Sequence, residues 1–212
     1  MPTAAQLSAF AVTAFVVIVI PGPSVLFVVG RALGGGLRMA VLSVLGNALG
    51  EYLQVMAVAF GAGALAERSV TAFTVMKVAG GAYLIYLGVR TFRDRGQLAA
   101  ALADTPGPGS DRRSFLQGFT VGATNPKTLV FLAAILPQFV DRGRGGVTVQ
   151  VLALGLVFLA IAVFSDTGWA LAAGRFRSWF GRSPRRLELV GGAGGLAIVA
   201  VGVGLIASGR RD

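Results

Sequence analysis

Long apolar runs recur along this chain, and they limit its fold more than any other feature. Several of them reach twenty residues or more, the length that an α-helix needs to cross a hydrocarbon core of about 30 Å. A soluble domain would instead space its apolar residues along one face of each element. Of the 212 residues, 55% are hydrophobic and 13% are charged, and the mean hydropathy is +0.75. The chain therefore belongs in lipid.

The apolar runs predict an all-α integral membrane protein with six transmembrane helices. The expected spans cover residues 6–30, 39–65, 70–90, 114–139, 147–173 and 188–207. The first run is too long for the apolar core of a signal peptide, and no basic segment precedes it. The 31 glycines suit helices that pack closely, and Gly46 and Gly50 predict one such contact.

The basic residues between the expected spans are divided unevenly between two sides. The connections after the first, third and fifth spans hold twelve: Arg31, Arg38, Arg90, Arg93, Arg95, Arg112, Arg113, Arg175, Arg177, Arg182, Arg185 and Arg186. The other side holds five: Arg68, Arg142, Arg144, Arg210 and Arg211. Because basic connections remain in the cytoplasm, we expect both termini outside. These clusters explain the net charge of +10 without a nucleic-acid partner, and they suit contact with anionic lipid heads.

The two halves of the chain resemble each other. Residues 77–82 resemble 188–193, and residues 23–27 resemble 127–131. An odd number of spans in each repeat gives the halves opposite orientations, which is the inverted-repeat plan of many secondary transporters. We expect a first three-helix repeat at 1–95, a cytoplasmic linker at 96–112 and a second three-helix repeat at 113–212.

Four ionisable residues lie within the expected spans, namely Glu51, Lys77, Lys127 and Asp166. An unpaired charge near the centre of a membrane helix costs about 2.5–3.5 kcal/mol, so these groups should pair or face water. Lys77 lies about two turns from the end of its helix, from which its side chain reaches the interface. The other three are candidates for a binding site or a proton relay.

Prolines interrupt the first and fourth expected spans, at Pro21-Gly22-Pro23 and at Asn125-Pro126. Each proline removes a backbone donor, and irregular backbone persists in a membrane only against protein or a water-filled cavity. The half-helix that resumes presents free N–H groups and a positive dipole end, which suit a carboxylate. We therefore expect a substrate-binding site that comprises Pro21, Gly22, Pro23, Ser24, Asn125, Pro126, Lys127, Thr128 and Trp169.

Two arrangements of the charged groups remain open. In the first, Lys127 and the half-helix ends hold the carboxylate of a zwitterion, while Asp166 or Glu51 holds its ammonium group. In the second, Asp166 and Lys127 form a salt bridge that opens when Asp166 is protonated. We assign proton coupling to Asp166 and Glu51. Trp169 lies three residues after Asp166, where it either stacks over the site or packs beside it.

Cysteine and histidine are absent from the chain, and this limits its chemistry. Disulfides, Cys/His zinc sites and histidine proton relays are excluded, and we expect no metal and no cofactor. One alternative to a transporter is an intramembrane enzyme, for which Asp166 has only Glu51 as a candidate partner. Another is a carrier of an inorganic ion or other small solute, although two acids alone form a poor cation cage.

Several of these segments together resemble the lysine exporter and homoserine/threonine efflux (LysE/RhtB-type) family over nearly the whole chain. The shared pattern is Pro21-Gly22-Pro23, Gly46 with Gly50 and Glu51, residues 80–84, Asn125-Pro126-Lys127 with residues 136–140, and Asp166 with an aromatic residue three positions on. The resemblance implies a secondary transporter, not an enzyme, that exports amino acids or related zwitterions across the inner (cytoplasmic) membrane of a bacterium. It also implies that the proton motive force drives export, and it is compatible with a homodimer.

Overall fold

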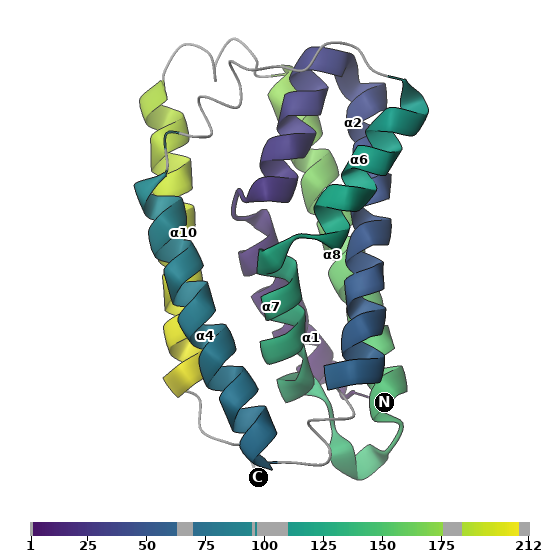
Figure 1. Ribbon diagram of the computed structural model, residues 1–212, viewed down its shortest axis with the longest axis vertical. Helices are drawn as coiled ribbons and strands as arrows, with labels where there is room; N and C mark the ends of the chain where they lie inside the picture. Colours follow the sequence, from purple (N-terminus) through teal and green to yellow (C-terminus); the bar gives the residue numbers. More distant parts are fainter. Residues whose placement is uncertain (1, 63–69, 95, 97–109, 176–183, 208–212) are drawn as a thin grey trace.

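The computed structural model describes residues 2–62, 70–94, 96, 110–175 and 184–207. Its helices run roughly along the long axis of the molecule (Figure 1). In chain order the elements are α1 (Ala4–Val19), α2 (Pro23–Ala57), the π-helical turn η1 (Val58–Ala62), α4 (Val70–Arg93), α6 (Asp111–Ala123), α7 (Pro126–Ala134), the short 3-10 helices η2 (Leu136–Phe139) and η3 (Arg142–Arg144), α8 (Val147–Arg175) and α10 (Pro184–Ala207). Most of the expected linker at 96–112 lies outside the described residues.

The first expected span is broken at the predicted prolines, and its two pieces are α1 and the beginning of α2. α1 begins with a capping box, in which the side chains of Thr3 and Gln6 each accept a hydrogen bond from the other residue's backbone N–H. It ends at Val19. α2 begins with Pro23, a position where the missing N–H has no helical partner to lose. The break predicted from the sequence is therefore confirmed.

The chain turns at Gly36, inside α2, without an intervening loop. Gly36 has a φ of 81°, a left-handed conformation that residues with a Cβ atom rarely adopt. Figure 1 shows α2 rising to this turn and then descending beside its first part. The expected connection between the spans, residues 31–38, is thus wrong in detail: it is helical apart from Gly36, because one glycine suffices to redirect the chain.

The fourth expected span is also broken where its proline predicts. α6 ends at Ala123, α7 begins at Pro126, and the chain bends by 44° between them. Figure 1 shows this break and the one between α1 and α2 near the middle of the molecule's length. Both breaks therefore lie far from the helix ends where a bilayer surface is expected.

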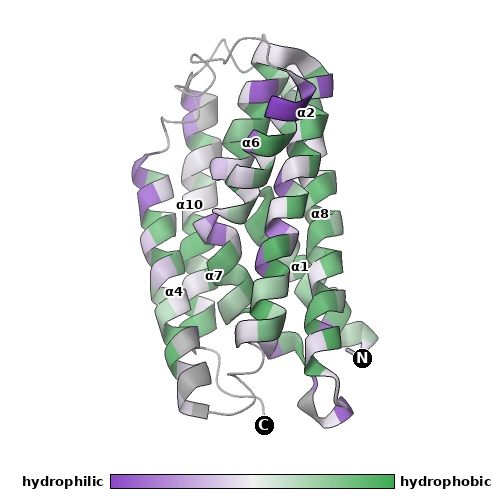
Figure 2. Cartoon of the chain, turned by 45° about the vertical axis from the view of Figure 1, so that its right-hand side comes forward, coloured by the Kyte–Doolittle hydropathy of each residue, from purple (hydrophilic) through white to green (hydrophobic). Residues whose placement is uncertain are grey.

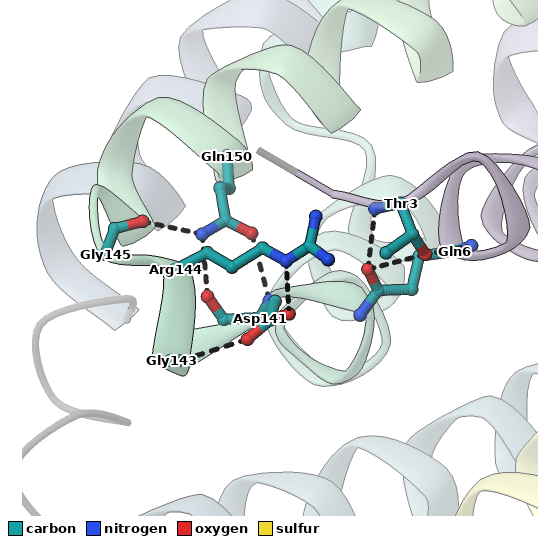
Figure 3. Close-up of polar contacts among 7 residues, drawn as sticks. All are labelled: Thr3, Gln6, Asp141, Gly143, Arg144, Gly145 and Gln150. Carbon is teal, nitrogen blue, oxygen red and sulfur yellow. Dashed lines mark hydrogen bonds and ion pairs between the residues drawn. The ribbon is translucent and has the colours of Figure 1, made fainter.

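The loop between η2 and α8 is held together by its own polar groups (Figure 3). The side-chain oxygen of Gln150 accepts a hydrogen bond from the backbone N–H of Asp141 at 2.9 Å. The side-chain nitrogen of Gln150 donates to the carbonyl oxygens of Asp141 and Gly145 at 2.8 and 2.7 Å. Arg144 forms an ion pair with Asp141 at 3.1 Å. This end of the second half is thus a defined turn into α8.

Small residues bring α2 and α6 into close contact. A Cβ atom at Gly46 or Gly50 would collide with the backbone of α6, and one at Gly118 or Gly122 would collide with the backbone of α2. Such contacts stabilise helix pairs in a membrane, where apolar burial alone favours no partner over lipid. The helix contact predicted at Gly46 and Gly50 is confirmed.

Within the described residues, two helices are long and apolar enough to cross a membrane: Pro23–Gly61, with 39 residues, and Val147–Arg175, with 29. The bent pair Asp111–Ala123 and Pro126–Phe139 adds a third if it counts as one span. Large apolar side chains point outward, among them Phe60 and Phe164, which are 69% and 80% exposed. Figure 2 shows hydrophobic residues along most of the length of these helices. The fold is that of a helical membrane protein, as expected.

Candidate functional site

A small cavity lies where the two helix breaks meet. It encloses about 10 Å³, about the room that one water molecule needs. Its polar lining comes from residues that the sequence singled out: Ser24, Glu51, Asn125, Lys127, Thr128 and Asp166. Apolar side chains, including Phe131 and Phe158, complete it. The structure thus brings the predicted polar residues of α2, α7 and α8 together in one pocket.

Asn125 connects the two breaks. Its side-chain oxygen accepts a hydrogen bond from the backbone N–H of Lys127 at 3.1 Å and so caps the beginning of α7. Its side-chain nitrogen donates to the Ser24 hydroxyl at 2.8 Å, in the first turn of α2. Asn125 is buried, so both bonds are shielded from water. They fix the resumed half-helices relative to each other.

Lys127 reaches across to the end of α1. Its ammonium nitrogen donates to the carbonyl oxygens of Val17 and Ile20 at 3.1 and 2.9 Å. The Val17 carbonyl would normally bond the N–H four residues on, but that residue is Pro21, which has none. Gly22 leaves room for the lysine, because a Cβ atom there would lie 3.2 Å from the ammonium nitrogen. A cation at this position also suits the negative end of the α1 dipole.

Trp169 closes the same helix end. Its indole N–H donates to the carbonyl oxygen of Val19 at 3.2 Å. The helical partner of this carbonyl would be the N–H of residue 23, which is again a proline. The two prolines of Pro21-Gly22-Pro23 therefore release two carbonyls, and side chains from α7 and α8 take them. The sequence left two roles open for Trp169, stacking over the site or packing beside it. The structure adds a third role, that of a hydrogen-bond donor.

The two acids, Glu51 and Asp166, are 4% and 3% exposed. Glu51 accepts a hydrogen bond from the Thr128 hydroxyl at 3.1 Å, and Asp166 accepts one from the Asn47 amide at 3.2 Å. The second oxygen of Glu51 has no hydrogen-bond partner among the described residues. In the described part of the chain, Lys127 forms no ion pair with either acid. Both carboxyl groups thus retain capacity for a ligand.

Two amides of α2, Asn47 and Gln54, belong to the site but were not predicted. The Gln54 side chain donates to the carbonyl oxygens of Ala123 and Asn125 at 2.9 and 3.2 Å, which caps the end of α6. A sequence signal for both existed, since an amide within a membrane helix is expected to bond to a neighbouring helix.

The remaining predicted residues lie beside the cavity or away from it. Pro21 and Gly22 are buried next to Lys127, whereas Pro23 is exposed at the first position of α2. Pro126 begins α7 and is half-buried. Lys77 is half-buried in α4 and does not line the cavity.

The arrangement offers two kinds of recognition. Carbonyl oxygens at the end of α1 and two carboxyl groups provide acceptors for an ammonium group. The first turn of α2, where the N-cap Gly22 provides no side-chain bond, presents N–H groups to an anion. A molecule with an amino group, with or without a carboxylate, fits this chemistry.

Comparison with known proteins gives the family. The model of the LysE type translocator family matches residues 15–209. A homoserine/homoserine lactone efflux protein of Salmonella typhimurium is 34% identical over 96% of each chain, and one of Salmonella typhi is 33% identical over 96% of each. A membrane protein of Vibrio cholerae, described as uncharacterized, is 34% identical over 79% of this chain and 82% of its own. No solved structure matches the chain.

The chain therefore belongs to the LysE type translocator family, as the sequence motifs indicated. This family moves solutes across membranes and does not consist of enzymes, so the alternative of an intramembrane enzyme is excluded. The protein is a membrane transporter for a small molecule.

Proposed function

We propose that this protein exports homoserine and related small amino compounds across the bacterial cytoplasmic membrane, driven by the proton motive force. The observation that carries the proposal is the buried cavity that gathers two carboxyl groups, one ammonium group and the carbonyl end of α1. Such a group of charges is costly in a membrane unless it serves a substrate or an ion. The relatives named as homoserine/homoserine lactone efflux proteins supply the substrate class.

The proposed architecture has six crossings in two inverted three-helix repeats, 1–95 and 113–212, joined by a linker at 96–112. The first crossing is α1 with the beginning of α2, and the fourth is α6 with α7. Both of these are broken at mid-length, and each resumes with a proline, Pro23 or Pro126. α4 and α10, the last helices of the two halves, pack reciprocally, with Gly81 against Gly202 and Gly88 against Gly195. A two-fold axis between the repeats would interchange these two helices.

The middle helices of the two repeats support the same axis. Glu51 and Gln54 are three residues apart in α2, and Asp166 and Trp169 are three residues apart in α8. In each pair the acid lines the cavity and the donor caps the broken helix of the other repeat. The acids are thus proposed to occupy equivalent positions on opposite sides of the substrate.

The proposed orientation has both termini outside. The turn at Gly36, the end of α8 and the beginnings of α6 and α10 lie toward the same end of the molecule, the upper end in Figure 1. The helix ends that flank the Arg-rich connections lie at this end, which the positive-inside rule assigns to the cytoplasm. Anionic lipid heads and a second copy of the chain are the further partners that we propose.

The amino group of the substrate is the proposed anchor. Homoserine and homoserine lactone, the two compounds in the names of the relatives, share a primary amine, but only homoserine has a free carboxylate. Several acceptors for an ammonium group line this cavity, including the carboxyl groups of Glu51 and Asp166. Where a carboxylate is present, we place it at the first turn of α2, beside Ser24.

Proton coupling is assigned to Asp166 and Glu51. Each can carry a proton inward after the substrate has left, since both face the same cavity and neither forms an ion pair with Lys127 in the described residues. A carboxyl group that accepts a proton no longer competes for a cation, so proton entry favours release of the ammonium group.

The test uses purified protein in liposomes loaded with radiolabelled homoserine. We expect efflux to accelerate when the outer solution is made acidic, and Asp166→Asn to lose this acceleration. Lys77→Ala, which removes an intramembrane lysine away from the cavity, is the matched control and should behave as the unchanged protein. Absence of flux for homoserine, its lactone and a panel of standard amino acids would contradict the proposal, as would full gradient-driven export by the Asp166→Asn variant.

A further inference from the structure

The Lys127 ammonium group rests on a site that suits the amino group of a substrate. Two of its three N–H groups bond to the carbonyl oxygens of Val17 and Ile20, and the side chain is 6% exposed. A primary ammonium on a substrate is chemically the same group. It would find the same acceptors, the same dipole end and the same space beside Gly22.

The site holds one ammonium group at a time. The cavity next to Lys127 encloses about 10 Å³, which is too little for a substrate molecule that brings a second ammonium group. The third carbonyl at this helix end, that of Val19, is bonded to Trp169. A substrate amine can therefore reach the end of α1 only if the lysine moves away.

We propose that Lys127 is an internal stand-in for the substrate, whose ammonium group occupies the substrate's amine site whenever the transporter is empty. This inference rests on the proposed function. When a substrate amine binds at Val17 and Ile20, the lysine is displaced toward Glu51 and Asp166, which line the same cavity. When the substrate leaves, the lysine returns.

The stand-in gives the empty transporter a way to return to the inward-facing state. Broken helices leave carbonyls without helical partners. A conformational change that buries such a carbonyl in the membrane without a hydrogen-bond donor costs free energy. With substrate or with Lys127 in place, the carbonyls at the end of α1 have hydrogen-bond donors. The loaded and the empty transporter can therefore both change between the inward-facing and outward-facing states. Lys127 is thus a positioning residue for the return step.

The rival reading assigns Lys127 to the carboxylate of the substrate, and it predicts a different defect. A lysine that binds substrate is needed for every transport mode. A stand-in is needed for net export, in which the site returns empty, but not for homoserine/homoserine exchange, in which the site is loaded in both directions.

The deciding experiment compares these two modes in liposomes containing the Lys127→Met variant, which keeps an unbranched side chain one atom shorter and removes the charge. Because loss of two charge-assisted hydrogen bonds costs about tenfold or more in an equilibrium constant, we expect net export of labelled homoserine to fall by at least that factor. Exchange should remain within about twofold of the unchanged protein, since this spread corresponds to a small fraction of one such bond. Lys77→Ala should leave both modes unchanged.

A second variant tests the site itself and does not depend on the behaviour of the first. Lys127→Ala leaves room for a small amine, and millimolar methylamine outside the liposomes should restore efflux of homoserine, because methylammonium can fill the site on the return step. Equal loss of exchange and net export in Lys127→Met, full net export by that variant, or no response of Lys127→Ala to methylamine would each overturn the inference. Absence of homoserine flux in the unchanged protein would instead refute the proposed function, and the stand-in would fall with it.

Discussion

At the break between α6 and α7, neutral amides close both helix ends, whereas at the break between α1 and α2 a lysine and an indole close one end and the other has no side-chain cap. Gln54 donates to the last carbonyl of α6, that of Ala123, and to the carbonyl of Asn125, whose side chain caps α7. Lys127 and Trp169 bond the last carbonyls of α1, and Gly22 precedes α2. The breaks are equivalent in position but not in chemistry.

This difference leads us to propose different roles for the two breaks. Amide caps are neutral and carry no group that a substrate must replace, so the second break is suited to holding the two half-helices in place. The first break offers an exchangeable cation at one end and open N–H groups at the other, which is what a small amino acid requires. In the proposed inverted repeat, the second break is thus the fixed one and the first break is the one that responds to substrate.

The largest expected effect is on stability, at the second break. Gln54→Leu leaves the carbonyl oxygen of Ala123 without its side-chain donor and removes one of two donors from that of Asn125, which keeps the N–H of Leu129. This should cost about 2 kcal/mol of unfolding free energy. Thermal unfolding in detergent measures this, with Leu53→Ala on the exposed side of α2 as the control. The folded variant should keep the ratio of net export to exchange found in the unchanged protein. If this ratio falls as expected for Lys127→Met, the two breaks do not differ in function.

A smaller effect follows if the open end of α2 is given a cap like that of α7. Gly22→Ser supplies a hydroxyl that bonds the first-turn N–H groups, a bond of about 0.5–2 kcal/mol, and so competes with a carboxylate. Relative to Gly22→Ala, we expect the KM for homoserine to rise about twofold to thirtyfold on that energy, while the KM for homoserine lactone stays constant. Gly22→Ala adds the Cβ atom without the oxygen and is the control. Equal shifts for both compounds in the serine variant would mean that the carboxylate binds elsewhere.

The smallest effect is expected where one cap of the second break is removed. Asn125→Ala deletes the N-cap of α7 and the bond to Ser24, and N-cap losses cost about 1 kcal/mol. Calorimetric or fluorescence unfolding in detergent should show a correspondingly modest decrease in the midpoint. If gradient-driven export falls much further than this loss of stability explains, Asn125 binds the substrate and does not only cap α7.

The sequence predicts the breaks because proline has a local effect that no tertiary contact cancels in a membrane. It also predicts the contact of Gly46 and Gly50, since their spacing alone places them on one helix face. The turn at Gly36 was missed because three glycines occur in succession at 34–36, and no local rule states which of them adopts a positive φ or whether a loop follows.

The cavity was predicted in part, for a different physical reason. Charge within a span makes Glu51, Lys127 and Asp166 candidates for the site, but it does not give their partners, which come from other helices. The sequence suggested that Lys127 holds a carboxylate or Asp166, and the structure places its ammonium group on the carbonyls of α1 instead. Those carbonyls belong to the backbone, which every residue has, so the identity of the residues does not predict this contact.

Substrate protection of a single cysteine at Ser24 tests the central claim most directly. The chain contains no cysteine, so Ser24→Cys places one thiol in the cavity between the breaks, and Ser8→Cys at the exposed beginning of α1 provides a control. We predict that homoserine slows alkylation of the cysteine at position 24 in proportion to its occupancy of the transporter, and leaves the cysteine at position 8 unaffected. Alkylation at position 24 that is indifferent to homoserine, at concentrations that saturate export, would contradict a substrate site at the helix breaks.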